Sequence, residues 1–275
     1  MEFLVVFAIL FILYVLMVRI DSKRIKKLSF MHILAAHRGL YSKDQRIPEN
    51  SLAAFQNAID HGYAIELDVQ CSKDLDVFVF HDDNLVRMCK RLDVLKTMTS
   101  DEIRKERLMD STERIPTLAD TLKLVDGKVP LWVEIKTTLR RQETVDKVME
   151  LLAEYKGDTS ICSFDPLILL ELKRRYPHVI RGIIVENFAA DKSRPWYIFI
   201  VLFFCLLNFL VRPDYQSFDV AQLHHPTYRL NRLLGAHSVF WVIRSFQQEQ
   251  IVRQSCDNFI FEYYLPPIEL SDVIA

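Results

Sequence analysis

The sequence predicts an α/β protein, a TIM-type (β/α)8 barrel with a small insertion after its second strand and an N-terminal transmembrane helix. Short apolar runs alternate with amphipathic segments along most of the chain, as in parallel strands joined by crossover helices. A chain of 275 residues, of which 50% are hydrophobic, is long enough to fill one such barrel. Charged residues also follow several of the apolar runs, and barrel enzymes carry their reactive groups at the carboxyl ends of strands.

The first segment, residues 1–20, is expected to be a transmembrane anchor. Residues 3–18 are an unbroken apolar run, which as a helix would be about 24–27 Å long, enough for a slightly thinned bilayer. A cleaved signal peptide is disfavoured, because no Lys or Arg precedes the run and no small-residue cleavage site follows it. The basic segment 21–31 comes next. The positive-inside rule then places the rest of the chain on the cytoplasmic side of the cell membrane.

Residues 32–275 are predicted to form the barrel domain. A further apolar run at 77–80 follows the turn after the second strand, and the polar stretch 83–115 forms the insertion, with one short helix near 100–106. The eight strands are expected at 33–36, 64–71, 131–136, 160–164, 181–185, 215–220, 239–243 and 259–261. Helices are expected at 52–62, 117–125, 144–155 and 166–176.

The segment 196–211 departs from this pattern. It occupies the position of the helix between the fifth and sixth strands, yet Asn208 is its one strongly polar residue. An outer barrel helix should have a single apolar stripe. A membrane-spanning helix here would prevent barrel closure, so we expect a helix that contacts the membrane interface. An ordinary buried helix is the alternative.

Composition adds limits on partners. The net charge of −1 gives no electrostatic argument for a nucleic-acid partner. The five cysteines lack the spacing of a metal site, and nothing in the sequence identifies a protein partner.

Three acids are candidate metal ligands. Glu66 and Asp68 lie two residues apart in a predicted strand, so both leave it on the same side, and Glu134 lies near the end of another. Carboxylate oxygens are the ligands that Mg²⁺ and Ca²⁺ prefer. The alternative is structural pairing with Arg38 or Lys136, but three acids are costly to bury without a cation.

Two histidines are candidate catalysts. His37 and His81 each follow an apolar run, and histidine can act as general acid or base near neutral pH. A structural role is the alternative for each. Arg38 and Lys136 are the candidate phosphate-binding residues. Asp82 is expected to orient a histidine or to cap a turn.

The motifs Ala36-His37-Arg38-Gly39, Pro48-Glu49-Asn50, Glu66-Leu67-Asp68 and His81-Asp82 stand in this order. Together they resemble the glycerophosphodiester phosphodiesterase family, over about residues 34–265, in the form of a membrane-anchored bacterial-type member. The resemblance implies metal-dependent hydrolysis of glycerophosphodiesters to an alcohol and glycerol 3-phosphate, in phospholipid and glycerol metabolism. One histidine would take the proton of the attacking hydroxyl and the other would protonate the leaving alcohol. Trp241 would line the substrate pocket.

Near the barrel mouth the chain departs from the family. Arg244 stands where the family has Asn, and Phe261-Glu262 where it has Thr-Asp. Both changes bear on substrate preference, and the apolar segments favour a membrane lipid as partner. A lysophospholipase D or a phosphoinositide-cleaving enzyme on the same barrel is therefore an alternative, with a lysophospholipid among the substrates. An inactive membrane-bound phospholipid-binding or scaffold protein is the non-enzyme alternative.

Overall fold

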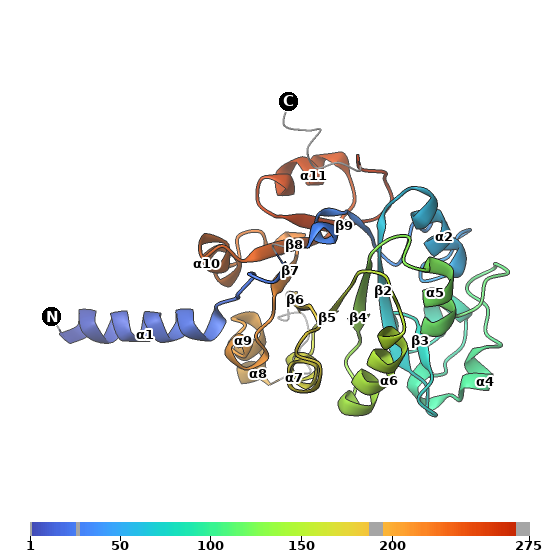
Figure 1. Cartoon of the computed structure of the whole chain (residues 1–275), viewed down its shortest axis with the longest axis horizontal. Coiled ribbons are helices and arrows are strands. Elements are labelled where there is room, and N and C mark those ends of the chain that lie inside the picture. The colour runs from blue at the N-terminus through green and yellow to red at the C-terminus, as the bar shows by residue number, and fades with distance from the viewer. Residues whose placement is uncertain (1, 26–27, 187–194, 268–275) are drawn as a thin grey trace.

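The computed structural model describes residues 2–25, 28–186 and 195–267, and its core is a closed parallel barrel (Figure 1). Closure is complete because β1 pairs in parallel with both β2 and β9. The barrel strands are β1 (Ala35–Ala36), β2 (Ala64–Cys71), β4 (Leu131–Ile135), β5 (Thr159–Ser163), β6 (Arg181–Val185), β7 (Tyr215–Asp219), β8 (His237–Ile243) and β9 (Asn258–Phe261). The predicted eight-stranded barrel is thus confirmed.

Helices surround this barrel. Ser51 and Thr117 begin two of them, because each side chain accepts a hydrogen bond from a backbone N–H of the first turn. The outer helices are α2 (Leu52–Asp60), α5 (Leu118–Val125), α6 (Arg141–Ala153), α7 (Pro166–Arg175), α10 (Pro226–Leu233) and α11 (Phe246–Arg253). The sequence did not predict α10 or α11, since these eight-residue helices carry few apolar residues.

The predicted insertion packs beside the barrel around a small core of its own. It follows β3 (Val77–Val79), which pairs antiparallel with β2. The core includes Phe78, Phe80, Leu85 and Met88. The short helices here are α3 (Val86–Cys89), η3 (Leu95–Thr97) and α4 (Ser100–Ile103). The expected helix near 100–106 is therefore present but shorter.

Residues 21–25 and 28–31 pack against the amino end of the barrel. Ile25 and Met31 are buried, and both join the apolar cluster that fills this end. Ser22 Oγ donates to the Asp214 carbonyl over 2.6 Å, and Arg24 Nη2 lies 2.6 Å from the Asp214 carboxylate. Lys26 and Lys27 of the predicted basic linker lie outside the described residues. This segment therefore covers the amino end of the barrel, and the candidate site lies at the carboxyl end.

The expected transmembrane helix at residues 1–20 requires correction. Within residues 2–25, 28–186 and 195–267, no helix has both the length and the apolar character needed to cross a membrane. The N-terminal helix α1 (Glu2–Val18) has 17 residues. It ends at Val18, whose carbonyl accepts the side-chain amides of Asn208 and Asn231.

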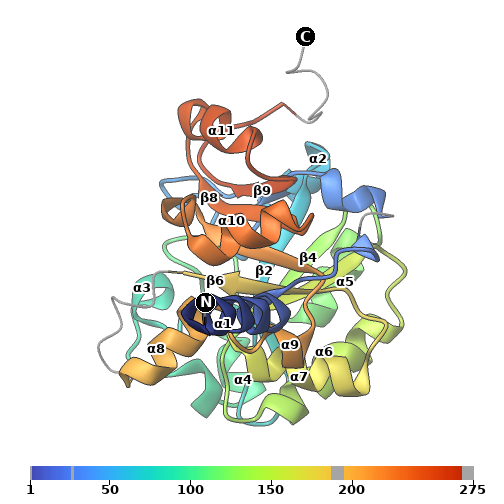
Figure 2. The ribbon, with the colours of Figure 1, turned by 90° about the vertical axis from the view of Figure 1, so that its left-hand side faces the viewer.

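The segment 196–211 forms two short helices instead of the single expected helix. α8 (Trp196–Phe203) and α9 (Asn208–Val211) are separated by a turn in which Cys205 takes a left-handed conformation, with φ of 53°. Asn208 is buried through its bond to α1. In Figure 2, α8 and α9 lie close to α1 on the same side of the barrel. The expected membrane contact of this segment stays a prediction.

Candidate active site

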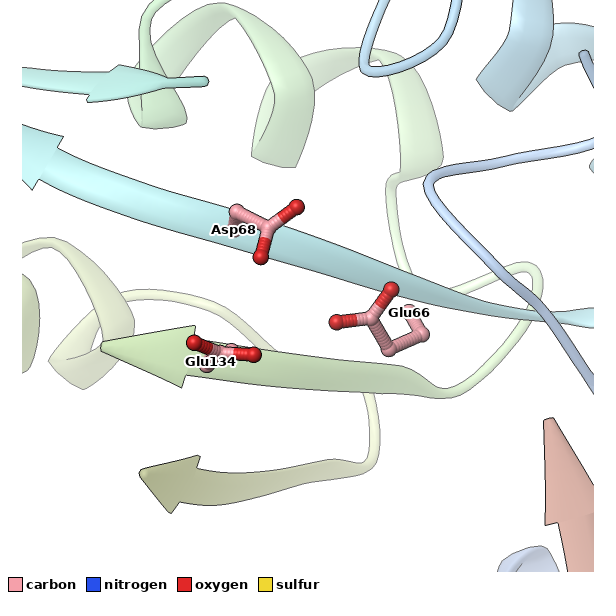
Figure 3. A group of neighbouring side chains, drawn as sticks. All are labelled: Glu66, Asp68 and Glu134. Carbon is pink, nitrogen blue, oxygen red and sulfur yellow. The ribbon is translucent and has the colours of Figure 1, made fainter. Parts of the chain in front are cut away.

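Three buried carboxylates lie together toward the carboxyl ends of β2 and β4 (Figure 3). Glu66 and Asp68 come from β2, and Glu134 stands opposite Asp68 in the β2–β4 register. One oxygen from each carboxylate can be chosen so that all three lie within 4.8 Å of one another. The backbone N–H of Arg38 donates to Glu66 Oε2 over 3.1 Å. The predicted ligands are therefore brought together.

Burial and charge divide the three acids. Burial, followed by repulsion from Asp68 and Glu134, raises the pKa of Glu66 well above its ordinary value. Burial also raises the pKa of Glu134, although Lys136 opposes it. Burial alone would raise the pKa of Asp68, but the charges of Lys136 and Arg38 outweigh it and lower that pKa. A divalent cation would favour the ionised form of each acid, so this all-oxygen donor set fits Mg²⁺ or Ca²⁺.

Two cations border the cluster. Lys136 Nζ lies 2.7 Å from Glu134 Oε1 and 3.4 Å from Asp68 Oδ1. Arg38 Nη1 donates to Glu49 Oε1 over 2.5 Å, and its Nε lies 3.4 Å from Asp68 Oδ2. These carboxylates raise the pKa of Lys136 and of Arg38 despite burial, which acts in the opposite direction. Both side chains thus hold positive charge beside the cluster, as phosphate binding requires.

Asn50 of the Pro48-Glu49-Asn50 motif bonds to one of the three acids. Its neighbour Ser51 caps α2, while Asn50 Nδ2 donates to Asp68 Oδ2 over 2.9 Å. Asn50 Oδ1 is buried and accepts no hydrogen bond within the described residues. This free oxygen acceptor close to Asp68 suits a site that binds a cation.

His37 is held where the barrel closes. Its backbone N–H donates to the Phe261 carbonyl over 2.9 Å, and its Nδ1 lies 2.6 Å from Glu262 Oε2. Tyr41 and Arg244 also donate to the Glu262 carboxylate, over 2.7 and 2.6 Å. Burial, and then the charge of Arg38, lowers the pKa of His37 below its ordinary 6.5, although Glu262 opposes this. His37 is therefore neutral at neutral pH.

His81 has a carboxylate partner of its own. Its Nδ1 lies 2.7 Å from Asp82 Oδ1, and Arg87 donates to the same carboxylate over 2.8 and 2.9 Å. Arg87 also donates to both oxygens of Glu49. Gln70 Nε2 donates to the backbone carbonyls of residues 80, 81 and 82. Asp82 thus orients a histidine, one of its two expected roles.

Trp241 borders the site through an aromatic neighbour. Its ring meets Phe164 edge to face at 5.5 Å between centroids. Lys136 Nζ lies 5.8 Å from the centre of the same Phe164 ring. The Trp241 indole N–H is buried and has no hydrogen-bond acceptor among the described residues, which leaves a donor for a substrate.

All the predicted site residues gather around the carboxyl end of the barrel. Sequence reasoning missed Gln70, Tyr41 and Arg87, which are polar residues without a motif. Arg244 and Glu262 were noticed as departures from the family pattern, but the contact of Glu262 with His37 was not predicted. That contact joins residues 225 positions apart, so only the closed barrel shows it.

The chain is similar to proteins of one family. Residues 37–221 match the sequence profile described as the Glycerophosphoryl diester phosphodiesterase family. A glycerophosphodiester phosphodiesterase from Caldanaerobacter subterraneus subsp. tengcongensis is 31% identical over 178 residues, which cover 60% of this chain and 70% of that protein.

Solved structures share the fold. A phosphodiesterase from Oleispira antarctica, in complex with the product sn-glycerol-3-phosphate, superposes with a TM-score of 0.68 at 21% identity, over 83% of this chain and 92% of that one. A glycerophosphodiester phosphodiesterase from Thermotoga maritima gives 0.64 at 23% identity, over 83% and 93%.

Proposed function

The chain belongs to the glycerophosphoryl diester phosphodiesterase family and is a glycerophosphodiester phosphodiesterase, and from this premise we propose a metal-dependent mechanism with two histidines as acid and base. The products are an alcohol and glycerol 3-phosphate, and phospholipid and glycerol metabolism is the proposed context. The observation that carries the mechanism is the cluster of Glu66, Asp68 and Glu134, whose oxygens can lie within 4.8 Å of one another.

Glu66, Asp68 and Glu134 would hold Mg²⁺ or Ca²⁺. Such an ion, when bound, would stabilise the negative charge that develops on the phosphoryl oxygens. Lys136 and Arg38 keep their positive charge beside the cluster, so they bind and orient the phosphodiester. Trp241 lines the substrate pocket and offers its indole N–H.

His37 is the proposed general base. Its lowered pKa leaves it neutral near pH 7, so its free Nε2 can accept a proton from the water whose hydroxyl attacks phosphorus. The bond between phosphorus and the alcohol oxygen breaks, and His81, the proposed general acid, protonates the leaving alcohol. The proton gained and the proton given balance over one turnover, and solvent restores both histidines.

The test compares Glu66→Gln with wild type in the presence of Mg²⁺ or Ca²⁺, using glycerophosphocholine and an assay for glycerol 3-phosphate. We expect Glu66→Gln to lose at least about 100-fold in kcat, and a chelator to stop the wild type reversibly. Glu249→Gln is the matched control, because Glu249 is likewise buried but pairs with Arg253 within α11. Turnover of Glu66→Gln at the wild-type rate would contradict the assignment of Glu66 as a metal ligand.

A lysophospholipid is the second candidate substrate. The exposed apolar side chains of α1 and α8 favour it, because they would keep the protein close to lipid. A panel of glycerophosphocholine, lysophosphatidylcholine and lysophosphatidylinositol distinguishes the soluble substrate from the lipid ones. It also covers the phosphoinositide alternative.

We also propose that the protein works at the cytoplasmic surface of the cell membrane. The apolar side chains of α1 between Phe3 and Leu13 are mostly half or more exposed, and Trp196 and Tyr197 of α8 are 73% and 54% exposed. Exposed aromatic residues of this kind favour the headgroup region of a bilayer. Co-sedimentation with anionic vesicles tests the contact. Binding should weaken in Trp196→Ser/Tyr197→Ser, and unchanged binding would contradict the role of α8.

A further inference from the structure

The carboxylate beside His37 is supplied by the last strand of the barrel. His37 follows β1 and Glu262 follows β9, and these strands pair with Ala36 opposite Phe261. The register therefore places the two side chains next to each other, at 2.6 Å between His37 Nδ1 and Glu262 Oε2. The contact depends on barrel closure and not on any local turn.

Glu262 is itself held from two other directions. Oε2 also accepts the Tyr41 hydroxyl at 2.7 Å, and Oε1 accepts Arg244 Nε at 2.6 Å. Its side chain is 3% exposed, and burial opposes its ionisation. The bonds from His37 and Tyr41 and the charge of Arg244 outweigh burial and hold the pKa of Glu262 at about 2. The group is thus a fixed carboxylate at neutral pH.

We propose that Glu262, held by Arg244 and Tyr41, is a positioning residue that fixes the ring orientation and tautomer of His37. This inference rests on the proposed function of His37 as general base. The proton stays on Nδ1, which donates a hydrogen bond to Glu262, so that Nε2 carries the lone pair. When the attacking water gives its proton to Nε2, Glu262 stays ionised and stabilises the imidazolium that forms.

Arg244 and Glu262 act as one unit. Their side chains meet directly, with 2.6 Å between Arg244 Nε and Glu262 Oε1. A glutamate side chain has several rotatable bonds, so one contact alone would not fix it. The Arg244 bond restrains the oxygen that His37 does not use. The pair therefore holds the carboxylate in place for the base.

The test is Glu262→Gln in the full chain, assayed with glycerophosphocholine and the activating cation. The amide keeps the size of the side chain but removes the charge that balances the imidazolium. We expect kcat to fall about 100-fold while KM changes less than about threefold, because the residues that bind phosphate are untouched. The Nδ1–H proton resonance of His37, assigned with ¹⁵N-histidine, should shift or disappear.

Glu249→Gln is again the matched control, since it removes a buried carboxylate paired with an arginine outside the site. Arg244→Met is the second variant. Its side chain is 52% exposed, so the protein should still fold, and we expect kcat to fall about three- to tenfold. Arg244→Lys should restore part of this loss.

Several outcomes would overturn the inference. One is a kcat of Glu262→Gln within threefold of wild type while His37→Ala is inactive, which leaves the proposed function intact. Another is a change in KM alone, or an unchanged His37 resonance. Failure of the proposed function gives a different result. In that case His37→Ala and Glu66→Gln would turn over at the wild-type rate, and a chelator would not slow the wild type.

Discussion

The two histidines have partners of the same kind, a carboxylate and an arginine, but these partners come from near in the sequence in one case and from far in the other. In each case Nδ1 meets a carboxylate that an arginine also holds, Glu262 with Arg244 for His37 and Asp82 with Arg87 for His81. The His81 set comes from residues within a few positions of one another. The His37 set joins the first and last strands of the barrel.

Exposure separates the two sets further. The His37 and Glu262 side chains are 14% and 3% exposed, whereas those of His81 and Asp82 are 34% and 21% exposed. A buried histidine loses solvation of its charged form, and this lowers its pKa. The same pairing therefore places the proposed base in the buried closure of the barrel and the proposed acid nearer to solvent.

Removal of either histidine should have the largest effect. We expect His37→Ala and His81→Ala each to lower kcat about 1000-fold, because a positioned acid or base contributes about 10²–10⁴. The double variant should lose little more than either single one, since both act in the same step. Steady-state rates with glycerophosphocholine check this. If one single variant kept a tenth of the activity, the two histidines would not be equivalent in importance.

A better leaving group should then separate their roles. A nitrophenyl phosphodiester of glycerol releases an anion that needs no proton, so His81→Ala should regain about 10- to 100-fold relative to its rate with glycerophosphocholine. His37→Ala should gain nothing, because its missing step is proton removal. Recovery of His37→Ala in place of His81→Ala would exchange the assigned roles.

The pH profile of the wild type with the same nitrophenyl substrate is a further prediction. With this substrate the acid limb of kcat/KM should lie below pH 6.5, since the pKa of His37 is lowered.

The sequence could predict what depends on local pattern. Strand periodicity places Glu66 and Asp68 on one side of β2, and strand order brings Glu134 next to them, so the candidate metal ligands were predictable. Asp82 was recognisable because it adjoins His81. The partner of His37 was not, because the pairing of β1 with β9 depends on the closure of the whole barrel.

Two errors in the fold have similar physical causes. Apolar composition predicted one helix over 196–211, but tertiary contacts decide otherwise: Cys205 adopts a left-handed conformation and Asn208 turns inward to bond the end of α1. The expected transmembrane helix ends at Val18 for the same reason, since two asparagine side chains take its terminal carbonyl. Hydropathy reports how apolar a segment is, but it does not show which side chains will bond to its backbone and so where a helix will end.

The smallest expected effect concerns stability in acid, and it tests whether burial separates the two carboxylates. The pKa of Glu262 is lowered from 4.5 to about 2, so its ionised form stabilises the fold. This contribution is fully present above about pH 4.5 and is lost as the pH falls toward 2. Glu262→Gln should therefore cost about 1–3 kcal/mol at pH 7 and much less near pH 3.

Asp82→Asn is the matched comparison for Glu262→Gln, because the pKa of Asp82 is also lowered despite partial burial, through its bonds to His81 and Arg87. Asp82 is more exposed, so solvent screens these interactions and the loss at pH 7 should be smaller, about 1 kcal/mol or less. Urea unfolding at pH 7 and pH 3, with chelator present throughout, measures both losses. Equal losses for the two variants would show that exposure does not separate the two histidine–carboxylate pairs. A loss at Glu262 that persists unchanged at pH 3 would mean that packing, and not charge, stabilises the fold at this position.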